Sequence, residues 1–238
     1  MNKVSKPFQF KKFSVAQDKT AMKIGTDGVL LGAWVSMPNT TQSNCLDIGT
    51  GTGVIALMLA QRFNNVAIDA LDIDKGAFLQ AEANFEHSAW SNRLNVFNTA
   101  LKEFFSNKKY NLIVCNPPFF QSVQTVSTAR EQARQRASLP FAILLQHSKR
   151  LLDDSGELAV VIPYESQDEF CELAVKQNLF PYKKTRVYGT KNSKPKRILI
   201  QFAQTQQILV EKDLILEVAR HQYTADYIAL VKDFYLKL

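Results

Sequence analysis

Three glycines at alternate positions, Gly49, Gly51 and Gly53, separate an apolar run from a helical one in the sequence LDIGTGTGV. Glycines at the end of a strand let a ligand approach the backbone, and a helix that begins there offers free N–H groups. Asp72 lies 19 residues beyond Gly53, where its carboxylate could accept hydrogen bonds from both hydroxyls of a ribose. The glycine loop (residues 49–53) and this acid together predict a site for a nucleoside-containing cofactor.

The spacing of the glycines narrows the class of cofactor. A dinucleotide fingerprint, G-x-G-x-x-G, would need glycine at position 54, where this chain has Val54, and no P-loop sequence is present. Asp47, just before the loop, would repel a pyrophosphate. These features favour a ligand with a cationic end, such as an ammonium or a sulfonium group.

A second motif, NPPFF, follows the apolar run from Ile113 to Cys115. Proline cannot donate to a sheet ladder, so the strand must end at Asn116. The chain therefore leaves a buried strand in a rigid turn that carries an amide and two aromatic rings. If the motif has only a structural role, Asn116 caps the turn and the phenylalanines fill the core.

Alternating strands and helices must position these motifs. The apolar segments that predict strands are 45–48, 66–73, 94–101, 110–115 and 157–163. Two later segments, 182–188 and 197–203, predict the strands of a hairpin, joined by a turn that contains Gly, Asn, Ser and Pro. This order predicts an α/β fold with a doubly wound, mostly parallel sheet that ends in an antiparallel hairpin. In such sheets ligands bind at the carboxyl ends of the strands.

The predicted helices carry recognisable start signals. Asp74 is expected to cap a helix with Phe78, Ala81 and Phe85 on one face. Ser138 and Pro140 open another helix, and Ser166 with Glu169 would form a capping box. The apolar residues predicted to face the core from the helix after Pro140 and from the C-terminal helix are Phe141, Leu144, Leu145, Leu151, Tyr227, Val231, Phe234 and Leu238.

Length and composition bound the organisation of the chain. With 238 residues and no linker or repeat, it is expected to form a single domain, 1–238. No apolar run is long enough to span a membrane, and the N-terminus does not resemble a signal peptide. The three cysteines form neither a C-x-x-C pair nor a pattern with histidine, so we expect no metal site and a cytoplasmic location.

Charge is distributed unevenly. Lys and Arg exceed Asp and Glu by 29 to 22, and residues 183–197 hold seven basic residues and no acid. The first 23 residues add six Lys against one Asp. Arg130, Arg134 and Arg136 lie between these segments. A solvated charged face would explain either segment alone, but together they favour a polyanionic partner such as nucleic acid.

The sequences DIGTGTG, ALDID and NPPF, in this order, resemble class I S-adenosylmethionine-dependent methyltransferases that act on amino groups. The resemblance covers roughly residues 17–163 and implies a Rossmann-like fold with a mostly parallel seven-stranded sheet. Within the domain it implies a cofactor-closing segment (1–43), a cofactor-binding core (44–163) and a C-terminal hairpin and helix (164–238). The cofactor-binding residues that it implies are Thr26, Asp47, Gly49, Gly51, Gly53, Asp72, Ile73, Ala100, Leu101 and Asn116.

The chemistry of amine methylation explains the NPPF motif within this resemblance. An adenine amino group is a poor nucleophile because its lone pair is delocalised into the ring. If the Asn116 side-chain oxygen and the Pro117 carbonyl accept its N–H bonds, the nitrogen can pyramidalise toward the methyl group, and its developing charge meets two fixed dipoles. Phe119 could stack on the extruded base, a contact worth roughly 1–3 kcal/mol. The catalytic residues are therefore expected to be Asn116, Pro117 and Phe119.

Further residues are similar to a narrower family, the tRNA adenine-N6-methyltransferases that modify the adenine beside the anticodon of valine tRNA. They are QDKTAMKIGTDGVLLGAW (17–34) and the C-terminal VKDFYLKL. In this family the first segment closes over the cofactor, which makes Thr26 a candidate contact; a helix capped by Thr26 or Asp27 is also expected there. The partner implied is tRNA, and its expected contacts are Phe119, Phe120, Arg130, Arg134, Lys194, Lys196 and Arg197.

One departure from the methyltransferase pattern concerns the adenine of the cofactor. The sequence NVFNTALKEF lacks the acid that many methyltransferases carry after the third strand. Backbone and apolar contacts from Ala100 and Leu101 would then hold the adenine.

Other functions remain open from the sequence. N-P-P-aromatic motifs also serve guanine-N2 methylation of ribosomal RNA and methylation of a protein glutamine amide. The glutamine enzymes carry a helical domain before the glycine loop, for which 46 residues are too few. A catalytically inactive RNA-binding module would need neither Asn116 nor Asp72, and a titration with S-adenosylmethionine would distinguish it. An NAD-type oxidoreductase would require the missing dinucleotide fingerprint.

Overall fold

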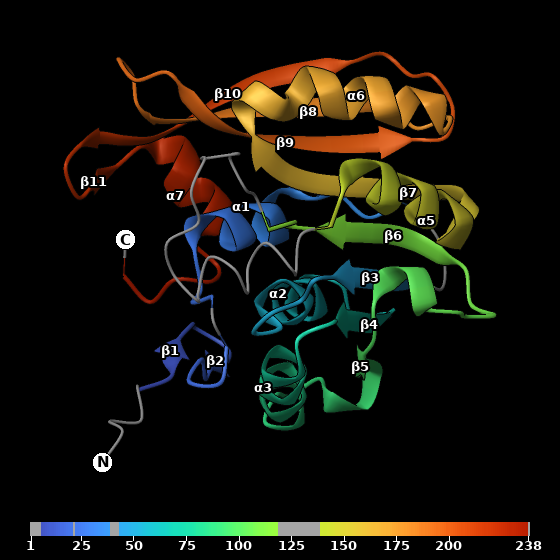
Figure 1. Ribbon diagram of the computed structural model, residues 1–238. Helices are drawn as coiled ribbons and strands as arrows, with labels where there is room; N and C mark the ends of the chain where they lie inside the picture. The colour runs from blue at the N-terminus through green and yellow to red at the C-terminus, as the bar shows by residue number, and fades with distance from the viewer. Residues whose placement is uncertain (1–5, 21, 39–42, 119–138, 238) are drawn as a thin grey trace, which may run out of the picture.

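A computed structural model of the protein describes residues 6–20, 22–38, 43–118 and 139–237. Within these residues nine strands form one twisted sheet with the order β11-β10-β8-β9-β7-β6-β3-β4-β5 (Figure 1). The strands are β3 (Ser43–Ile48), β4 (Val66–Asp72), β5 (Leu94–Asn98), β6 (Tyr110–Cys115), β7 (Leu152–Pro163), β8 (Phe180–Thr190), β9 (Pro195–Ala203), β10 (Val210–Ala219) and β11 (Gln222–Tyr223). Two short strands, β1 (Phe8–Gln9) and β2 (Ser14–Val15), pair separately.

The core strands β3 to β7 run parallel, and β9 turns antiparallel between β7 and β8. Alternate residues of the central strands face opposite sides of the sheet, as the two-residue period of a strand requires. Cys45, Leu112 and Val114 belong to one apolar cluster, whereas Leu46 and Ile113 belong to the other. The sheet therefore separates two hydrophobic cores, each covered by helices.

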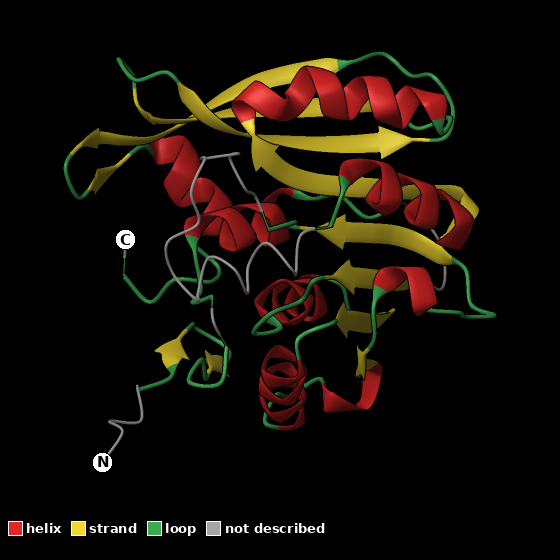
Figure 2. Ribbon diagram, in the orientation of Figure 1, coloured by secondary structure: helices red, strands yellow, loops and turns green. Residues whose placement is uncertain are grey.

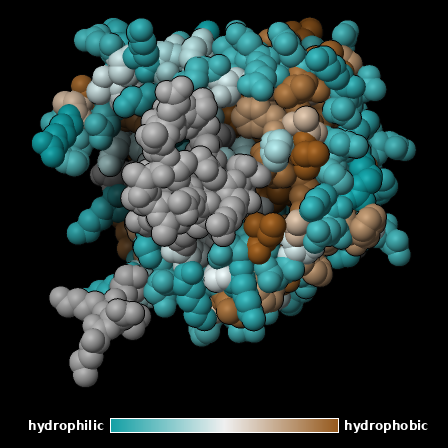
Figure 3. All heavy atoms as spheres, viewed as in Figure 1, coloured by the Kyte–Doolittle hydropathy of each residue, from teal (hydrophilic) through white to brown (hydrophobic). Residues whose placement is uncertain are grey.

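Helices cover both faces of this sheet (Figure 2). One core is covered by α1 (Thr26–Trp34), α2 (Val54–Arg62), α3 (Lys75–Glu86) and α7 (Ala225–Val231). The other is covered by α5 (Phe141–Leu151) and α6 (Gln167–Lys176). Short 3-10 turns, η1 (Ser91–Arg93), η2 (Leu101–Glu103) and η3 (Tyr164–Ser166), complete the described elements. On the face that Figure 3 shows, the surface is mostly hydrophilic. Apolar residues gather to the right of the grey atoms.

The predicted fold class is confirmed, and the sheet extends further than expected. The hairpin of β8 and β9 lies where the sequence predicts it, but β10 and β11 add two strands beyond the expected seven. Strand β10 pairs in parallel with β8 and exposes most of its residues, with Leu214 the one buried residue. A strand that exposes most of its residues lacks the apolar alternation that identifies strands in a sequence.

The helix start signals were only partly correct. Asp74 caps α3 as predicted, because its carboxylate accepts a 2.7 Å hydrogen bond from the Ala77 N–H. The capping box at Ser166 is wrong: Ser166 ends the η3 turn, and its side chain makes no cap hydrogen bond. A cap by Thr26 or Asp27 is also wrong, since α1 begins at Thr26 with Gly25 as N-cap and no side-chain cap hydrogen bond.

The cysteines behave as small apolar residues. Cys45 and Cys115 lie buried in β3 and β6, and all three cysteines are free thiols. Burial raises the pKa of Cys45 and Cys115 well above the usual range, with nearby Asp47 adding to the effect, so both thiols stay neutral. None of the helices that the structure describes has the length and apolarity needed to span a bilayer.

Candidate active site

Three of the predicted site features, the glycine loop, Asp72 and Asn116, lie at the ends of the neighbouring strands β3, β4 and β6. Ile48, the last residue of β3, pairs with Cys115 of β6 on one side and with Leu71 of β4 on the other. Neighbouring strands lie about 4.8 Å apart, so the next residues of the three strands converge. We call this end of the sheet the carboxyl edge; the arrowheads of β3, β4 and β6 point to it in Figure 1. The glycine loop, Asp72 and Asn116 all lie at this edge.

The glycine loop needs glycine for two different reasons. Gly49, Gly51 and Gly53 have positive φ angles of 71°, 58° and 81°, which other residues rarely adopt. A β-carbon at Gly49 or Gly51 would meet no atom within 4 Å, whereas one at Gly53 would lie 2.5 Å from Cε1 of Phe85. Gly53 therefore allows α2 and α3 to pack closely, and the first two glycines leave open space over the loop.

Asp72 fits the predicted contact with a ribose. Its Oδ2 accepts a 2.8 Å hydrogen bond from the Gly51 N–H, and its Oδ1 accepts a 2.9 Å hydrogen bond from the Asp74 N–H. Each oxygen keeps a second lone pair for a hydroxyl donor. Burial raises the pKa of Asp72, and the hydrogen bonds from Asp74 and Gly51 oppose that rise.

Asp47 lies wholly buried beneath the glycine loop, so it can influence a ligand only through its charge. Thr50 Oγ1 donates a 2.6 Å hydrogen bond to Oδ2 of Asp47. Oδ1 is buried and makes no well-formed hydrogen bond with a described residue, although the nearby Ala56 N–H favours the charged form and lowers the pKa. Burial, the largest effect, raises the pKa of Asp47 to about 7. A carboxylate that lacks a counter-charge beside the loop fits a cationic ligand.

Asn116 and Pro117 follow β6 directly, Asn116 half-buried and Pro117 buried. No described residue forms a hydrogen bond with the Asn116 side-chain amide, which leaves its oxygen available to accept one from an amine. The wall beside it is Gly28 of α1, where a β-carbon would lie 3.9 Å from Asn116 Nδ2. The predicted contacts Phe119, Phe120, Arg130 and Arg134 lie outside the described residues.

The residues expected to hold the cofactor adenine differ in what they can offer. Ile73 is 58% exposed at the carboxyl edge and can cover a flat base. Leu101 begins η2 and its side chain is buried in the core, so only its backbone could contact the adenine. Ala100, which precedes it, is half-buried. Asn98 was not singled out from the sequence, yet its Nδ2 donates 2.9 Å and 3.2 Å hydrogen bonds to the carbonyls of Asp72 and Ile73. Asn98 ends β5, whereas the sequence predicted a strand through residue 101, so the predicted bounds placed Asn98 inside the strand.

The chain before α1 is tied to the glycine loop by Asn84, a buried residue of α3 that the sequence did not reveal. Its side chain exchanges two 2.9 Å hydrogen bonds with the backbone of Ala16 and donates a third, 2.8 Å long, to the Thr52 carbonyl. One turn earlier, Gln80 accepts a 2.8 Å hydrogen bond from the Lys19 N–H. These bonds bring the segment that leads to Thr26 against α3, beside the loop.

The basic hairpin also lies at the carboxyl edge. Arg197 of β9 pairs with Pro163, the last residue of β7, and the turn of the hairpin lies beyond it. Lys194 and Lys196 are exposed there, whereas Arg197 donates a 2.8 Å hydrogen bond from Nε to Oδ2 of Asp27. The structure thus places all three predicted RNA contacts at the same edge of the sheet as Asn116, and it joins Arg197 to α1.

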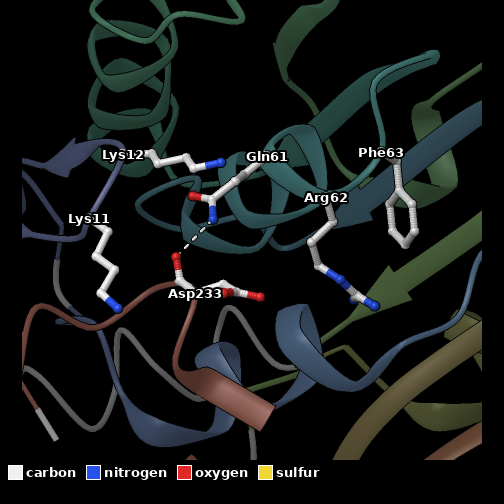
Figure 4. A pocket seen from close by; sticks show the side chains of 6 residues that line it. All are labelled: Lys11, Lys12, Gln61, Arg62, Phe63 and Asp233. Carbon is white, nitrogen blue, oxygen red and sulfur yellow. Dashed lines mark hydrogen bonds between the residues drawn. The ribbon is translucent and has the colours of Figure 1, made fainter. Parts of the chain in front are cut away.

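A cavity of about 470 Å³ lies elsewhere, at the opposite end of α2 from the glycine loop. Figure 4 shows its lining residues Lys11, Lys12, Gln61, Arg62, Phe63 and Asp233, with Gln61 donating to the Asp233 carbonyl. It contains none of the predicted site residues and no acid at the end of a core strand. Among the described residues, no group of three or more acidic, His or Cys side chains could hold a metal ion.

Comparison with known proteins gives a consistent result. Residues 26–178 match the family Methyltransferase small domain. A protein of Flavobacterium psychrophilum named tRNA1(Val) (adenine(37)-N6)-methyltransferase is 50% identical, over 97% of this chain and 100% of its own. A protein of Christiangramia forsetii with the same name is 48% identical, over 98% of this chain and 99% of its own. Among solved structures, a predicted O-methyltransferase from Agrobacterium tumefaciens shares the fold, with a TM-score of 0.69 and 15% identity over 87% of this chain and 96% of its own.

Proposed function

The chain belongs to the Methyltransferase small domain family and to its S-adenosylmethionine-dependent tRNA1(Val) (adenine(37)-N6)-methyltransferases, and from this membership we propose its reaction. The enzyme transfers a methyl group from S-adenosylmethionine to N6 of adenine 37 in tRNA1(Val). The observation that carries the proposal is the register of β6, β3 and β4, which brings Asn116, the glycine loop and Asp72 together at the carboxyl edge.

The cofactor would lie across the glycine loop. S-adenosylmethionine supplies a methyl group made electrophilic by its sulfonium. The open space over Gly49 and Gly51 allows its close approach to the backbone, and Asp72 accepts hydrogen bonds from its ribose. Ile73 covers the adenine. Asp47, buried beneath the loop, favours the cationic end of the cofactor through its charge.

The substrate amine would be held at Asn116 and Pro117. Adenine must leave its stack to reach this position. The Asn116 side-chain oxygen and the Pro117 carbonyl then accept the two N–H bonds of the amine, which fixes the direction of the nitrogen lone pair. Positive charge that develops on the nitrogen is stabilised by these preorganised dipoles, and the proton leaves to water afterward. Phe119 and Phe120 are proposed to stack on the base.

Binding of tRNA would depend on the basic hairpin. Lys194 and Lys196 are exposed beside the carboxyl edge, where a phosphate backbone could lie while one base reaches Asn116. Arg130 and Arg134 are proposed as further phosphate contacts. We infer a cytoplasmic location, which free thiols at all three cysteines support because a reducing compartment keeps them so.

The direct test is methyl transfer to defined RNA. The purified protein is incubated with tritiated S-adenosylmethionine and a tRNA1(Val) transcript, and the product is digested to nucleosides. We expect label in N6-methyladenosine and none when the transcript carries guanine at position 37. Label in N2-methylguanosine, or equal labelling of both transcripts, would contradict the proposal.

A further inference from the structure

We propose that the ion pair between Asp27 and Arg197 positions Asn116 through the first turn of α1, so that Arg197 acts as a positioning residue and not as a contact to RNA phosphate. The inference rests on the proposed function, because it concerns the same site. It assigns to Asp27 a role in the reaction and changes the role expected of Arg197.

The first step is the ion pair itself. Nε of Arg197 lies 2.8 Å from Oδ2 of Asp27, and the two side chains are 35% and 28% exposed. The residues are 170 positions apart in the chain. Arg197 belongs to β9, next to the end of β7, and Asp27 to the first turn of α1. The pair therefore ties α1 to the sheet at the carboxyl edge.

The second step links α1 to the catalytic motif. Gly28, directly after Asp27, lies beside Asn116: a β-carbon at Gly28 would be in ordinary van der Waals contact with Asn116 Nδ2, at 3.9 Å, and with Cγ1 of Val54, at 3.5 Å. No described residue hydrogen-bonds the Asn116 amide, so its orientation depends on its neighbours, of which this turn of α1 is one. Displacement of the turn would change where the Asn116 oxygen points.

The third step is that few polar side chains hold this turn, whose Gly28 and Val29 are buried in the core. Gly25, the N-cap of α1, provides no side-chain hydrogen bond, and the bond from the Val29 N–H to the Gly25 carbonyl is 3.5 Å long. The other end of α1 is firmly packed: Arg62 donates a 2.8 Å hydrogen bond to the Gly32 carbonyl. Among the described residues, the ion pair is therefore the polar side-chain contact that holds the end of α1 beside Asn116.

A role in phosphate binding makes opposite predictions for Asp27. If Arg197 contacts RNA, removing the negative charge of Asp27 should leave kcat unchanged and lower the KM for tRNA. If the pair positions α1, the variants Asp27→Asn and Arg197→Gln should both lower kcat and leave the KM for tRNA unchanged. The two side chains would then act as a unit, so the double variant should be no worse than either single one.

The experiment is a double-mutant cycle on the full chain. We expect each single variant and the double variant to lose about tenfold in kcat, in keeping with a hydrogen bond between charged groups. In the protein alone, amide hydrogen exchange of residues 26–32 should be faster in all three variants than in the wild type. The matched control is the exposed pair of Arg186 and Asp213 between β8 and β10, 2.6 Å apart, whose variants Arg186→Gln and Asp213→Asn should leave kcat unchanged.

Three results would overturn the proposal. The first is a raised KM for tRNA in Arg197→Gln together with normal kcat in Asp27→Asn, which would assign Arg197 to phosphate. The second is a double variant about a hundredfold slower than wild type, which would mean independent roles. The third is faster exchange of residues 26–32 with unchanged kcat. Failure of the wild type to methylate the tRNA would instead refute the proposed function, and the hydrogen-exchange results would still be interpretable.

Discussion

The backbone N–H of Gly51 donates a 2.8 Å hydrogen bond to Oδ2 of Asp72, so the loop after β3 and the acid at the end of β4 form one unit. The N–H groups of Gly49 and Thr50 reinforce this link, because both donate 2.9 Å hydrogen bonds to the Leu71 carbonyl. The protein itself thus holds the loop in place, and a ligand need not order it. Such preorganisation improves affinity by reducing the entropy lost on binding.

Asp72→Ala should weaken S-adenosylmethionine binding at least about tenfold, or about 1.4 kcal/mol, as measured by calorimetry. The variant removes both ribose acceptors and the anchor of the Gly51 N–H. Asp72→Asn, which keeps one carbonyl oxygen, should have an affinity between those of Asp72→Ala and the wild type. Unchanged affinity in Asp72→Ala would show that the ribose lies elsewhere.

Replacing two glycines of the loop by alanine should give different results. A β-carbon at Gly53 would collide with Phe85 at 2.5 Å, whereas one at Gly51 would meet nothing within 4 Å. Urea unfolding should therefore show Gly53→Ala to be less stable than Gly51→Ala by about 1–3 kcal/mol, the usual cost of overpacking. Both variants carry the strain of a positive φ, and Gly51→Ala should in addition weaken cofactor binding, because its methyl group occupies the open space over the loop. Equal stabilities would contradict the packing role of Gly53.

Asn116→Ala should lower kcat by about 10²–10³, the usual effect of losing one preorganised partner of a transition state. Affinity for S-adenosylmethionine should stay within a few-fold of the wild type, because Asn116 acts on the amine. Asn116→Asp keeps an acceptor oxygen and should retain more activity than the alanine variant. Wild-type single-turnover rates in Asn116→Ala would refute the mechanism.

The centre of the site could be predicted from the sequence because its residues lie at the ends of apolar strands. Gly49 and Asn116 come right after buried strands and Asp72 ends one, and parallel strands bring such positions to one edge. The side chains that hold the surrounding segments could not be predicted. Asn84 and Gln80 lie on the buried face of α3, where polar residues interrupt the apolar pattern, and their partners are backbone atoms 32 to 68 positions away.

The ion pair of Asp27 and Arg197 was missed for a related reason. The seven basic residues within 183–197 favoured a polyanionic partner, and Arg197 was expected to contact RNA together with Lys194 and Lys196. A sequence shows the charge of a side chain but not which partner, 170 residues away, neutralises it. The structure distinguishes Arg197, which is half-buried and paired, from the exposed Lys194 and Lys196.

Replacing Lys194 and Lys196 together by alanine should raise the KM for tRNA and flatten its dependence on salt. The slope should fall by about one for each phosphate that no longer has a lysine beside it. The rate at saturating tRNA and the affinity for S-adenosylmethionine should change little, because phosphate contacts position the RNA without taking part in the reaction. The control removes equal charge at the opposite edge of the sheet: Lys109→Ala with Lys176→Ala. A solvated turn that does not touch RNA predicts that both double variants behave alike.

The affinity for S-adenosylmethionine should rise as the pH increases through about 7, because burial raises the pKa of Asp47 from 3.8 to about 7. Below that pH the folded protein holds Asp47 protonated; above it the carboxylate attracts the cationic end of the cofactor. The raised pKa of Asp47 also lowers the stability of the free protein as the pH rises. An unfolded chain releases this proton at lower pH than the folded one, so Asp47 destabilises the free protein increasingly as the pH rises from 3.8 through about 7.

Asp47→Asn cannot ionise and provides the comparison. Calorimetry between about pH 5.5 and 7.5 should show the affinity of the wild type rising relative to that of the variant, with proton release on binding in the wild type only. The amino group of the cofactor titrates near pH 8, but it affects both proteins equally. Urea unfolding should show the free variant gaining stability relative to the wild type over the same range. Parallel affinity profiles would mean that the charge of Asp47 does not act on the cofactor.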